Sequence, residues 1–259
     1  MSAPYLEPAP VALAHRGGAA WEANAGNENS LLAFRHAVDL GFRYLETDAR
    51  ASADGVAFAF HDRDLSRVAP AAGTGERPFG TLTAETIRSV RLVGGEPIAT
   101  IPELLAAFPD ARLNIDVKTE TVIEPVVRAI EEAGAQDRVL IASFDHQRLQ
   151  RARRLLPGVA TSASPREVVA LITGRGRVRG MAARHGAVCV QVPERYRGRR
   201  LVTPRFIRIA HDEGLQVHVW TVDERDDMHR LLDVGVDGII TDRPDTLRAV
   251  LEERGQWRA

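Results

Sequence analysis

The sequence predicts an α/β fold, a TIM-type (β/α)8 barrel with a β-hairpin and a short insertion at its C-terminal rim. Three observations support this prediction. Short β-rich runs alternate with helical patterns along the whole chain, which is typical of parallel strands joined by helices. About eight such strands can be counted, and polar residues recur where nearly every strand ends. The length of 259 residues is ordinary for one barrel.

An open, doubly wound sheet is the alternative arrangement for the same alternation. No Gly-rich nucleotide-binding loop follows the first predicted strand, and the polar strand ends favour a closed barrel. We therefore expect one domain over residues 1–259. Residues from about 63 to 100 are the least regular part, and we expect them to form an insertion over the rim.

The predicted elements can be placed in order. The first strand covers residues 11–14. Asn29 or Ser30 could cap a helix over residues 31–40, which Gly41 would end. Two short helices are expected at 83–90 and, after Pro102, at 103–108. Further strands are expected at 113–118, 139–144, 159–163, 187–192, 216–222 and 237–241, with helices at 123–133, 147–156, 167–172, 204–213 and 224–234.

Residues 43–62 are expected to form a strand, a tight turn and a returning strand. Asp54-Gly55 is a strong signal for a two-residue hairpin turn. A parallel return would need a crossover of roughly a dozen residues, and the gap is about half that. The returning strand therefore brings His61 back towards Asp48.

Glu46 and Asp48 lie two residues apart on the outgoing strand, so their side chains point to the same face. Two carboxylates on one face repel each other, and a hard cation between them is the simplest remedy. A solvated strand edge is the alternative explanation. Asp116 and Lys118 share one face of strand 113–118 in the same way.

The C-terminal ends of barrel strands form one rim, so polar residues at these ends should meet at a single mouth. The residues expected there are His15, Glu46, Asp48, Asp116, Lys118, Phe144, Trp220 and Asp242. Three carboxylates, Glu46, Asp48 and Asp116, are expected to bind one divalent cation, Mg²⁺ or Ca²⁺. Zinc stays possible through His15 and His61.

The remaining polar groups fit a phosphate diester. Arg16 and Lys118, the only lysine in the chain, would cradle its oxygens, and Glu28 could be a further metal ligand or could hold Arg16 or His15 in place. His15 and His61 would exchange protons with the attacking hydroxyl and the leaving alkoxide. His218, which precedes Trp220, is a further histidine that could face the site.

The order and spacing of these motifs resemble the glycerophosphodiester phosphodiesterase family over about residues 11 to 250. The matching motifs are His15-Arg16-Gly17, Glu28-Asn29-Ser30, Glu46-Thr47-Asp48, Asp54-Gly55, His61-Asp62, Asp116-Val117-Lys118, Trp220-Thr221-Val222 and Asp237-Gly238-Ile239-Ile240-Thr241-Asp242-Arg243-Pro244. The resemblance implies a TIM barrel, dependence on a divalent metal, and hydrolysis of glycerophosphodiesters to glycerol 3-phosphate and an alcohol.

The resemblance also implies a role for each site residue. The acid/base pair would be His15 and His61, and the metal ligands would be Glu46, Asp48 and Asp116. Arg16 and Lys118 would bind phosphate, and Trp220 would form a wall against the glycerol. The sequence departs from the family pattern at Asn27, where proline is usual, and at Asp116, where glutamate is more common. The loop from His15 to Glu28 is also longer, so metal identity and substrate preference stay open.

The expected mechanism has two steps. The glycerol hydroxyl next to the phosphate attacks phosphorus and expels the alcohol, and water then opens the cyclic phosphate. Direct attack by water is the alternative, and either histidine could be the base in the first step. A lysophospholipase D-like hydrolase of lipid phosphodiesters is a rival function, for which the insertion residues Phe79, Leu82, Ile87 and Leu92 are only modestly apolar. A non-catalytic barrel that binds a phosphate ester is another.

Composition limits the possible partners. The net charge of -1 gives no reason to expect a nucleic-acid surface. The first ten residues lack the pattern of a secretory leader, and no apolar run approaches the roughly 20 residues of a membrane span. The only cysteine, Cys189, reads as a small buried apolar residue. We therefore expect a cytoplasmic enzyme for a small glycerophosphodiester, with no stable membrane association; the oligomeric state stays open.

Overall fold

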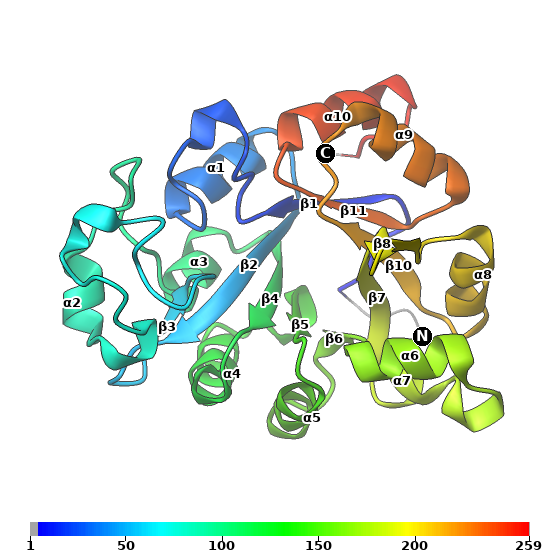
Figure 1. Cartoon of the computed structure of the whole chain (residues 1–259), viewed down its shortest axis with the longest axis horizontal. Coiled ribbons are helices and arrows are strands. Elements are labelled where there is room, and N and C mark those ends of the chain that lie inside the picture. Colours follow the sequence, from blue (N-terminus) through cyan, green and yellow to red (C-terminus); the bar gives the residue numbers. More distant parts are fainter. Residues whose placement is uncertain (1–4, 259) are drawn as a thin grey trace.

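Eight parallel strands close into a barrel in the computed structural model, which describes residues 5–258 (Figure 1). The strands follow the order β1-β11-β10-β7-β6-β5-β4-β2, and β2 also pairs with β1, so the sheet closes on itself. Their bounds are β1 Val11–His15, β2 Tyr44–Ala51, β4 Arg112–Val117, β5 Val139–Ala142, β6 Ala160–Ser162, β7 Ala187–Pro193, β10 Gln216–Trp220 and β11 Gly238–Thr241. The predicted TIM-type barrel is confirmed.

Helices surround the strands, as predicted (Figure 1). They are α1 Leu31–Asp39, α2 Ala84–Ser89, α3 Ile101–Ala107, α4 Ile123–Glu132, α5 His146–Leu155, α6 Pro165–Thr173, α8 Pro204–Asp212 and α9 Arg225–Val234. Of the two candidate caps of α1, Ser30 is the one used, since its side chain accepts a hydrogen bond from the Ala33 N–H.

Apart from short 3-10 helices, four elements were not predicted: helices α7 Met181–Arg184 and α10 Pro244–Glu253, and the two short antiparallel strands β8 Arg195–Tyr196 and β9 Arg199–Arg200. The short ones lie in arginine- and glycine-rich stretches without apolar periodicity. Helix α10 begins with Pro244 in its first turn, a favourable helix start that the sequence analysis missed.

The hairpin is present, but its turn differs from the prediction by one residue. Strand β3, Ala57–Ala59, runs antiparallel to β2. The connection, residues 52–56, has a three-residue tip, 53–55, because the Ser52 N–H donates to the Val56 carbonyl at 2.9 Å and so extends the pairing beyond the strand ends. Gly55 has a φ of +82°, the left-handed conformation that ends a three-residue hairpin loop.

Alternation along β2 directs the two carboxylates into the barrel. Leu45 and Ala49 pack in the core between strands and helices, whereas Tyr44 packs in the separate cluster inside the barrel. Glu46 and Asp48 share the face of Tyr44, so both point inward and both are buried. Cys189 is fully buried in the interior cluster, as predicted.

Residues 63–100, including α2, lie beside β3 at one side of the barrel (Figure 1). Their apolar side chains pack against Phe58 and Phe60, and the rings of Phe60 and Phe79 stack 4.4 Å apart. Leu82, Ile87 and Leu92 are buried in the same cluster, as is Phe79. The insertion therefore does not present these four side chains to a membrane.

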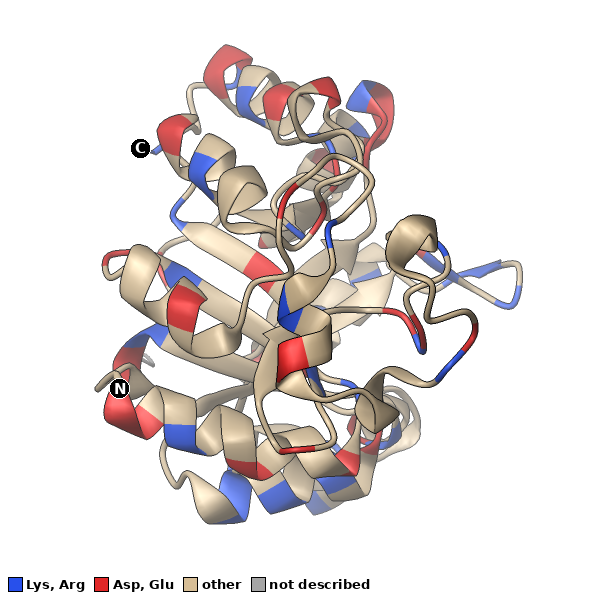
Figure 2. Cartoon of the chain, turned by 90° about the vertical axis from the view of Figure 1, so that its left-hand side faces the viewer, with Lys and Arg blue, Asp and Glu red and all other residues tan. Residues whose placement is uncertain are grey.

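Charged residues of both signs alternate along the outer helices in the view of Figure 2, while the strands are mostly uncharged. None of the helices described is long and apolar enough to span a bilayer. The first four residues of the N-terminal stretch that was read as leader-free lie outside the described residues, as does residue 259.

Candidate active site

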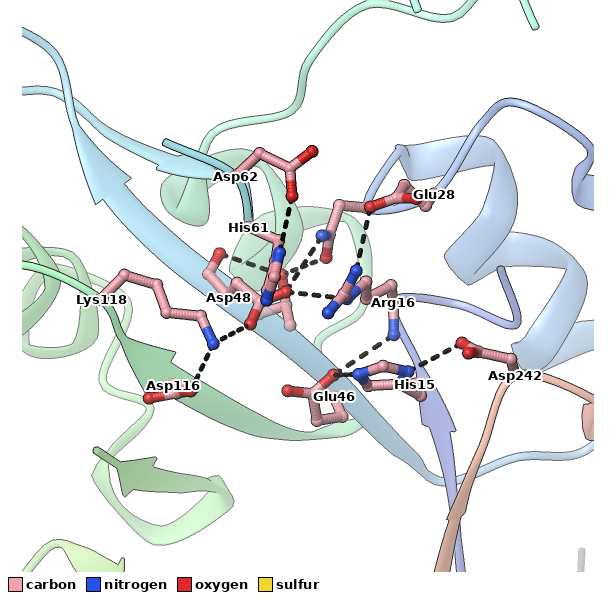
Figure 3. A network of polar contacts seen from close by, with 12 residues as sticks. His15, Arg16, Glu28, Glu46, Asp48, His61, Asp62, Asp116, Lys118 and Asp242 are labelled. Atoms are coloured by element: carbon pink, nitrogen blue, oxygen red, sulfur yellow. Dashed lines mark hydrogen bonds and ion pairs between the residues drawn. The ribbon is translucent and has the colours of Figure 1, made fainter. Parts of the chain in front are cut away.

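Strand register brings the predicted site residues together at the mouth of the barrel. His15 at the end of β1 lies opposite Glu46, and Asp48 lies opposite Asp116 of β4. The returning strand β3 leads directly to His61, since the Phe60 N–H donates to the Asp48 carbonyl at 2.9 Å. Figure 3 shows these side chains converging from β1, β2, β4 and the end of β3.

His15 is held between two carboxylates. Its Nδ1 lies 2.7 Å from Asp242 Oδ1, and its Nε2 lies 3.7 Å from Glu46 Oε2. Burial disfavours the imidazolium, but the negative charges of Glu46 and Asp242 outweigh burial and raise the pKa of His15. A carboxylate that accepts the Nδ1 proton fixes the tautomer, so Asp242 leaves Nε2 free for proton exchange.

His61 has the same arrangement on the opposite side of the site. Its Nδ1 lies 2.7 Å from Asp62 Oδ1, and Arg67 donates to Asp62 at 2.6 Å. The Arg50 guanidinium donates to the His61 carbonyl at 2.9 Å and so anchors the backbone. Both predicted histidines therefore carry a carboxylate at Nδ1, and the same ring nitrogen, Nε2, is left for chemistry.

Asp48 is the centre of the charge network (Figure 3). One carboxylate oxygen lies 3.0 Å from Arg16 Nε, and the other lies 2.7 Å from Lys118 Nζ. Burial opposes ionisation, but Lys118 and Arg16 outweigh it and lower the pKa of Asp48. Asn29 also donates to Asp48 at 3.4 Å. The predicted phosphate binders are thus ordered by a buried carboxylate.

Glu28 holds two arginines. Its carboxylate lies 3.2 Å from Arg16 Nη1 and forms a bidentate pair with Arg67 at 2.7 Å. The contact with Arg16 is one of the roles that the sequence left open for Glu28. Arg67 was missed because it lies in the irregular insertion, 39 residues from Glu28, where no periodic pattern points to it.

The three predicted metal ligands have properties that suit a hard cation. Burial, partly offset by His15, raises the pKa of Glu46 to about 7, and burial raises the pKa of Asp116. Asp116 Oδ1 is buried without a hydrogen-bond partner among the described residues. A bound cation would favour the ionised form of the two carboxyl groups and would supply a partner for the free Asp116 oxygen.

The side chains described do not form a closed set of metal ligands. Within residues 5–258, no three His, Cys, Asp or Glu side chains are placed to hold a metal as they stand. Lys118 Nζ instead lies between Asp48 and Asp116, at 2.7 and 2.6 Å. The donor set fits a hard cation chemically, and a bound ion would share these carboxylates with the ammonium group.

Two aromatic side chains flank the site. Trp220 and Phe144 pack edge to face with ring centroids 5.7 Å apart, and the Phe144 centroid lies 5.7 Å from Lys118 Nζ.

His218, the further histidine considered from the sequence, does not face the site. It is fully buried, its Nε2 lies 3.0 Å from Gln216 Oε1, and burial lowers its pKa to about 4.

Two histidines, His15 and His61, thus lie beside a cluster of cations and carboxylates at the carboxyl-end mouth of a closed barrel, where TIM-barrel enzymes carry their active sites. This arrangement defines a (β/α)8-barrel enzyme that acts on a charged substrate.

Comparison with known proteins identifies the family. The model of the glycerophosphoryl diester phosphodiesterase family matches residues 15–246, and the chain belongs to this family. The probable glycerophosphodiester phosphodiesterase 2 of Mycobacterium tuberculosis is 45% identical over 251 residues, which cover 95% of this chain and 92% of that protein. The resemblance read from the motifs is confirmed.

Two solved structures share the fold. A Silicibacter pomeroyi protein that carries the same family name has a TM-score of 0.80 at 24% identity, covering 98% of this chain and 97% of the other. An Oleispira antarctica phosphodiesterase, solved with its product sn-glycerol-3-phosphate, has a TM-score of 0.77 at 20% identity, covering 94% and 97%.

Proposed function

We propose that this enzyme hydrolyses glycerophosphodiesters to glycerol 3-phosphate and an alcohol. One observation carries the proposal: two histidines, each with an aspartate at Nδ1, flank one cluster of carboxylates and cations. Such a pair can take a proton from one oxygen and give a proton to another, while the cations bind the phosphate between them. Family membership and the product bound to the Oleispira relative agree with this reaction.

In the proposed first step, Arg16 and Lys118 bind the phosphate oxygens, and Trp220 packs against the glycerol. One histidine, His15 or His61, accepts the proton of the hydroxyl next to the phosphate as that oxygen bonds to phosphorus. The other histidine donates a proton to the departing alkoxide. The bond from phosphorus to the alcohol breaks, and a cyclic glycerol phosphate remains.

In the second step, water opens the cyclic phosphate with the histidines in exchanged roles. Glu46, Asp48 and Asp116 would hold a Mg²⁺ or Ca²⁺ ion, which when bound stabilises negative charge on the phosphoryl oxygens. Glu28, paired with Arg16 and Arg67, keeps the arginine directed at the site. Asp62 and Asp242 keep each Nε2 facing the reacting atoms.

Release of glycerol 3-phosphate from glycerophosphocholine tests both the reaction and the need for a cation. We expect turnover with Mg²⁺ or Ca²⁺, and a loss of roughly 10²-fold or more after chelation, because the cation contributes several kcal/mol. Adding either ion back to the chelated protein should restore the rate. An unchanged rate after chelation would overturn the metal proposal, and no glycerol 3-phosphate under any condition would overturn the reaction.

The complete acid/base pair argues against the non-catalytic alternative, because a barrel that only binds an ester has no use for two oriented imidazoles. We also propose a cytoplasmic location, because the one cysteine, Cys189, is buried and unpaired, as expected in a reducing compartment. Cell fractionation with an antibody to the chain would check this.

A further inference from the structure

An apolar groove of about 350 Å³ opens beside the active site, between α6 and strands β5, β7 and β10. Its walls include Phe144, Val169, Ile172, Tyr196 and Leu201. The volume lies in the range of roughly 300–1,000 Å³ that small-molecule sites occupy.

The groove gathers much of the exposed apolar surface of the molecule. Seven large apolar side chains are exposed among the described residues, and four of them line this groove. Phe144, Val169 and Tyr196 are each exposed by 58–60%, and Ile172 by 38%. Single exposed apolar side chains scattered over a surface are normal and need no explanation. A contiguous apolar patch on a folded domain instead marks a binding site.

The groove is continuous with the catalytic mouth. Asp116 and Trp220 line it as well as the site, and Phe144 joins the two through its contacts with Trp220 and Lys118. If the phosphate of a substrate lies at Lys118 and its glycerol lies at Trp220, a group attached to that glycerol can therefore extend into the groove.

One polar group in the groove has no partner. Gln191 lines it, and the Gln191 side-chain NH₂ is buried without a hydrogen-bond acceptor among the described residues. An unpaired buried donor costs free energy that a ligand carbonyl can recover. The groove thus offers apolar walls and a donor, which matches an ester-linked hydrocarbon chain.

We propose that this groove binds the acyl chain of a single-chain glycerophosphodiester lipid. The proposal rests on the function proposed above and specifies its substrate. The hydroxyl next to the phosphate must be free to attack, so the chain has to be esterified to the far hydroxyl of the glycerol. A 1-acyl lysolipid satisfies this requirement, whereas a diacyl lipid has no free hydroxyl. The hydrolysis then yields 1-acylglycerol 3-phosphate and the headgroup alcohol.

Binding of products with chains of increasing length tests the groove without relying on turnover. Titration calorimetry would use glycerol 3-phosphate and its 1-butanoyl, 1-hexanoyl and 1-octanoyl esters. We expect Kd to fall roughly twofold or more per methylene, below the roughly fourfold that complete burial of a CH₂ would give. A Kd that does not change with chain length would overturn the proposal.

Val169→Asp and Ile172→Asp place a charge in the groove at exposed positions of α6, away from the catalytic groups. We expect each to weaken octanoyl ester binding at least tenfold and to leave the Kd of glycerol 3-phosphate unchanged. Val93→Asp is the matched control, since Val93 is 65% exposed and lies outside the groove. Equal losses in the control would also contradict the proposal.

Turnover separates this inference from the function on which it rests. We expect kcat/KM for 1-octanoyl lysophosphatidylcholine to exceed that for glycerophosphocholine, and the α6 variants to remove the difference. If glycerophosphocholine is cleaved but chain length has no effect on binding or turnover, the groove proposal fails alone. If esters bind according to chain length but no phosphodiester is cleaved, the reaction fails and the groove remains an acyl site.

Discussion

Replacing His15 or His61 with alanine is expected to lower kcat for glycerophosphocholine by roughly 10²–10⁴, because in the proposed reaction each imidazole carries one proton transfer in the slow step. KM should change little, since we propose that Arg16 and Lys118, and not the imidazoles, bind the phosphate. The measurement is the rate of glycerol 3-phosphate release at saturating substrate. The double variant should be less impaired than the product of the two single losses, because the two groups act as a unit.

Two controls sharpen this test. His229→Ala removes a histidine on α9 that contacts Glu253 and Arg254, away from the predicted site residues, and it should keep the wild-type rate. Asp242→Asn keeps the imidazole of His15 but removes the carboxylate at Nδ1, so we expect an intermediate rate and an altered pH–rate profile. Wild-type rates in both alanine variants would show that the acid/base pair lies elsewhere.

Asp48→Asn is expected to reduce the free energy of unfolding by up to about 3–5 kcal/mol, because it removes the buried carboxylate that Arg16 and Lys118 share and leaves each cation with one fewer acidic partner. Activity should also fall, since the same two cations are proposed to bind the phosphate. Denaturant unfolding of metal-free protein measures the effect. Asp39→Asn, at an exposed position of α1, is the control and should change stability by less than about 0.5 kcal/mol.

The sign of the pH dependence follows from the lowered pKa of Asp48. An acid with a depressed folded-state pKa stabilises the protein above its unfolded pKa, and this stabilisation is lost as pH falls through the folded value. The difference in the free energy of unfolding between wild type and Asp48→Asn should therefore have its full size at neutral pH and shrink below about pH 4. Adding Lys118→Met to Asp48→Asn should recover part of the loss, and strictly additive effects would contradict a direct ion pair.

Residue spacing was enough to predict which side chains of one strand share a face. Glu46 and Asp48 point into the barrel together, and Asp116 and Lys118 both contact the site, as their two-residue spacing implied. The recurrence of polar residues at strand ends favoured the barrel, because closure gathers these ends around one mouth, whereas an open sheet spreads them along an edge.

Pairings between distant segments could not be read from the sequence. The contact of Glu28 with Arg67 joins a rim loop to the insertion, and neither segment has a periodic pattern that fixes its conformation. The position of Lys118 between two carboxylates depends on the register of β2 with β4, which sequence leaves open. The apolar groove was also missed, because its side chains come from α6, β8 and strand ends that are far apart in the chain.

A crystal structure of the protein with glycerol 3-phosphate and Mg²⁺ tests the central claim most directly. We expect the phosphate within hydrogen-bond distance of Arg16 and Lys118, the ion on Glu46, Asp48 and Asp116, and Nε2 of both His15 and His61 facing the phosphate oxygens. A phosphate bound outside this mouth, or an ion held by other side chains, would contradict it.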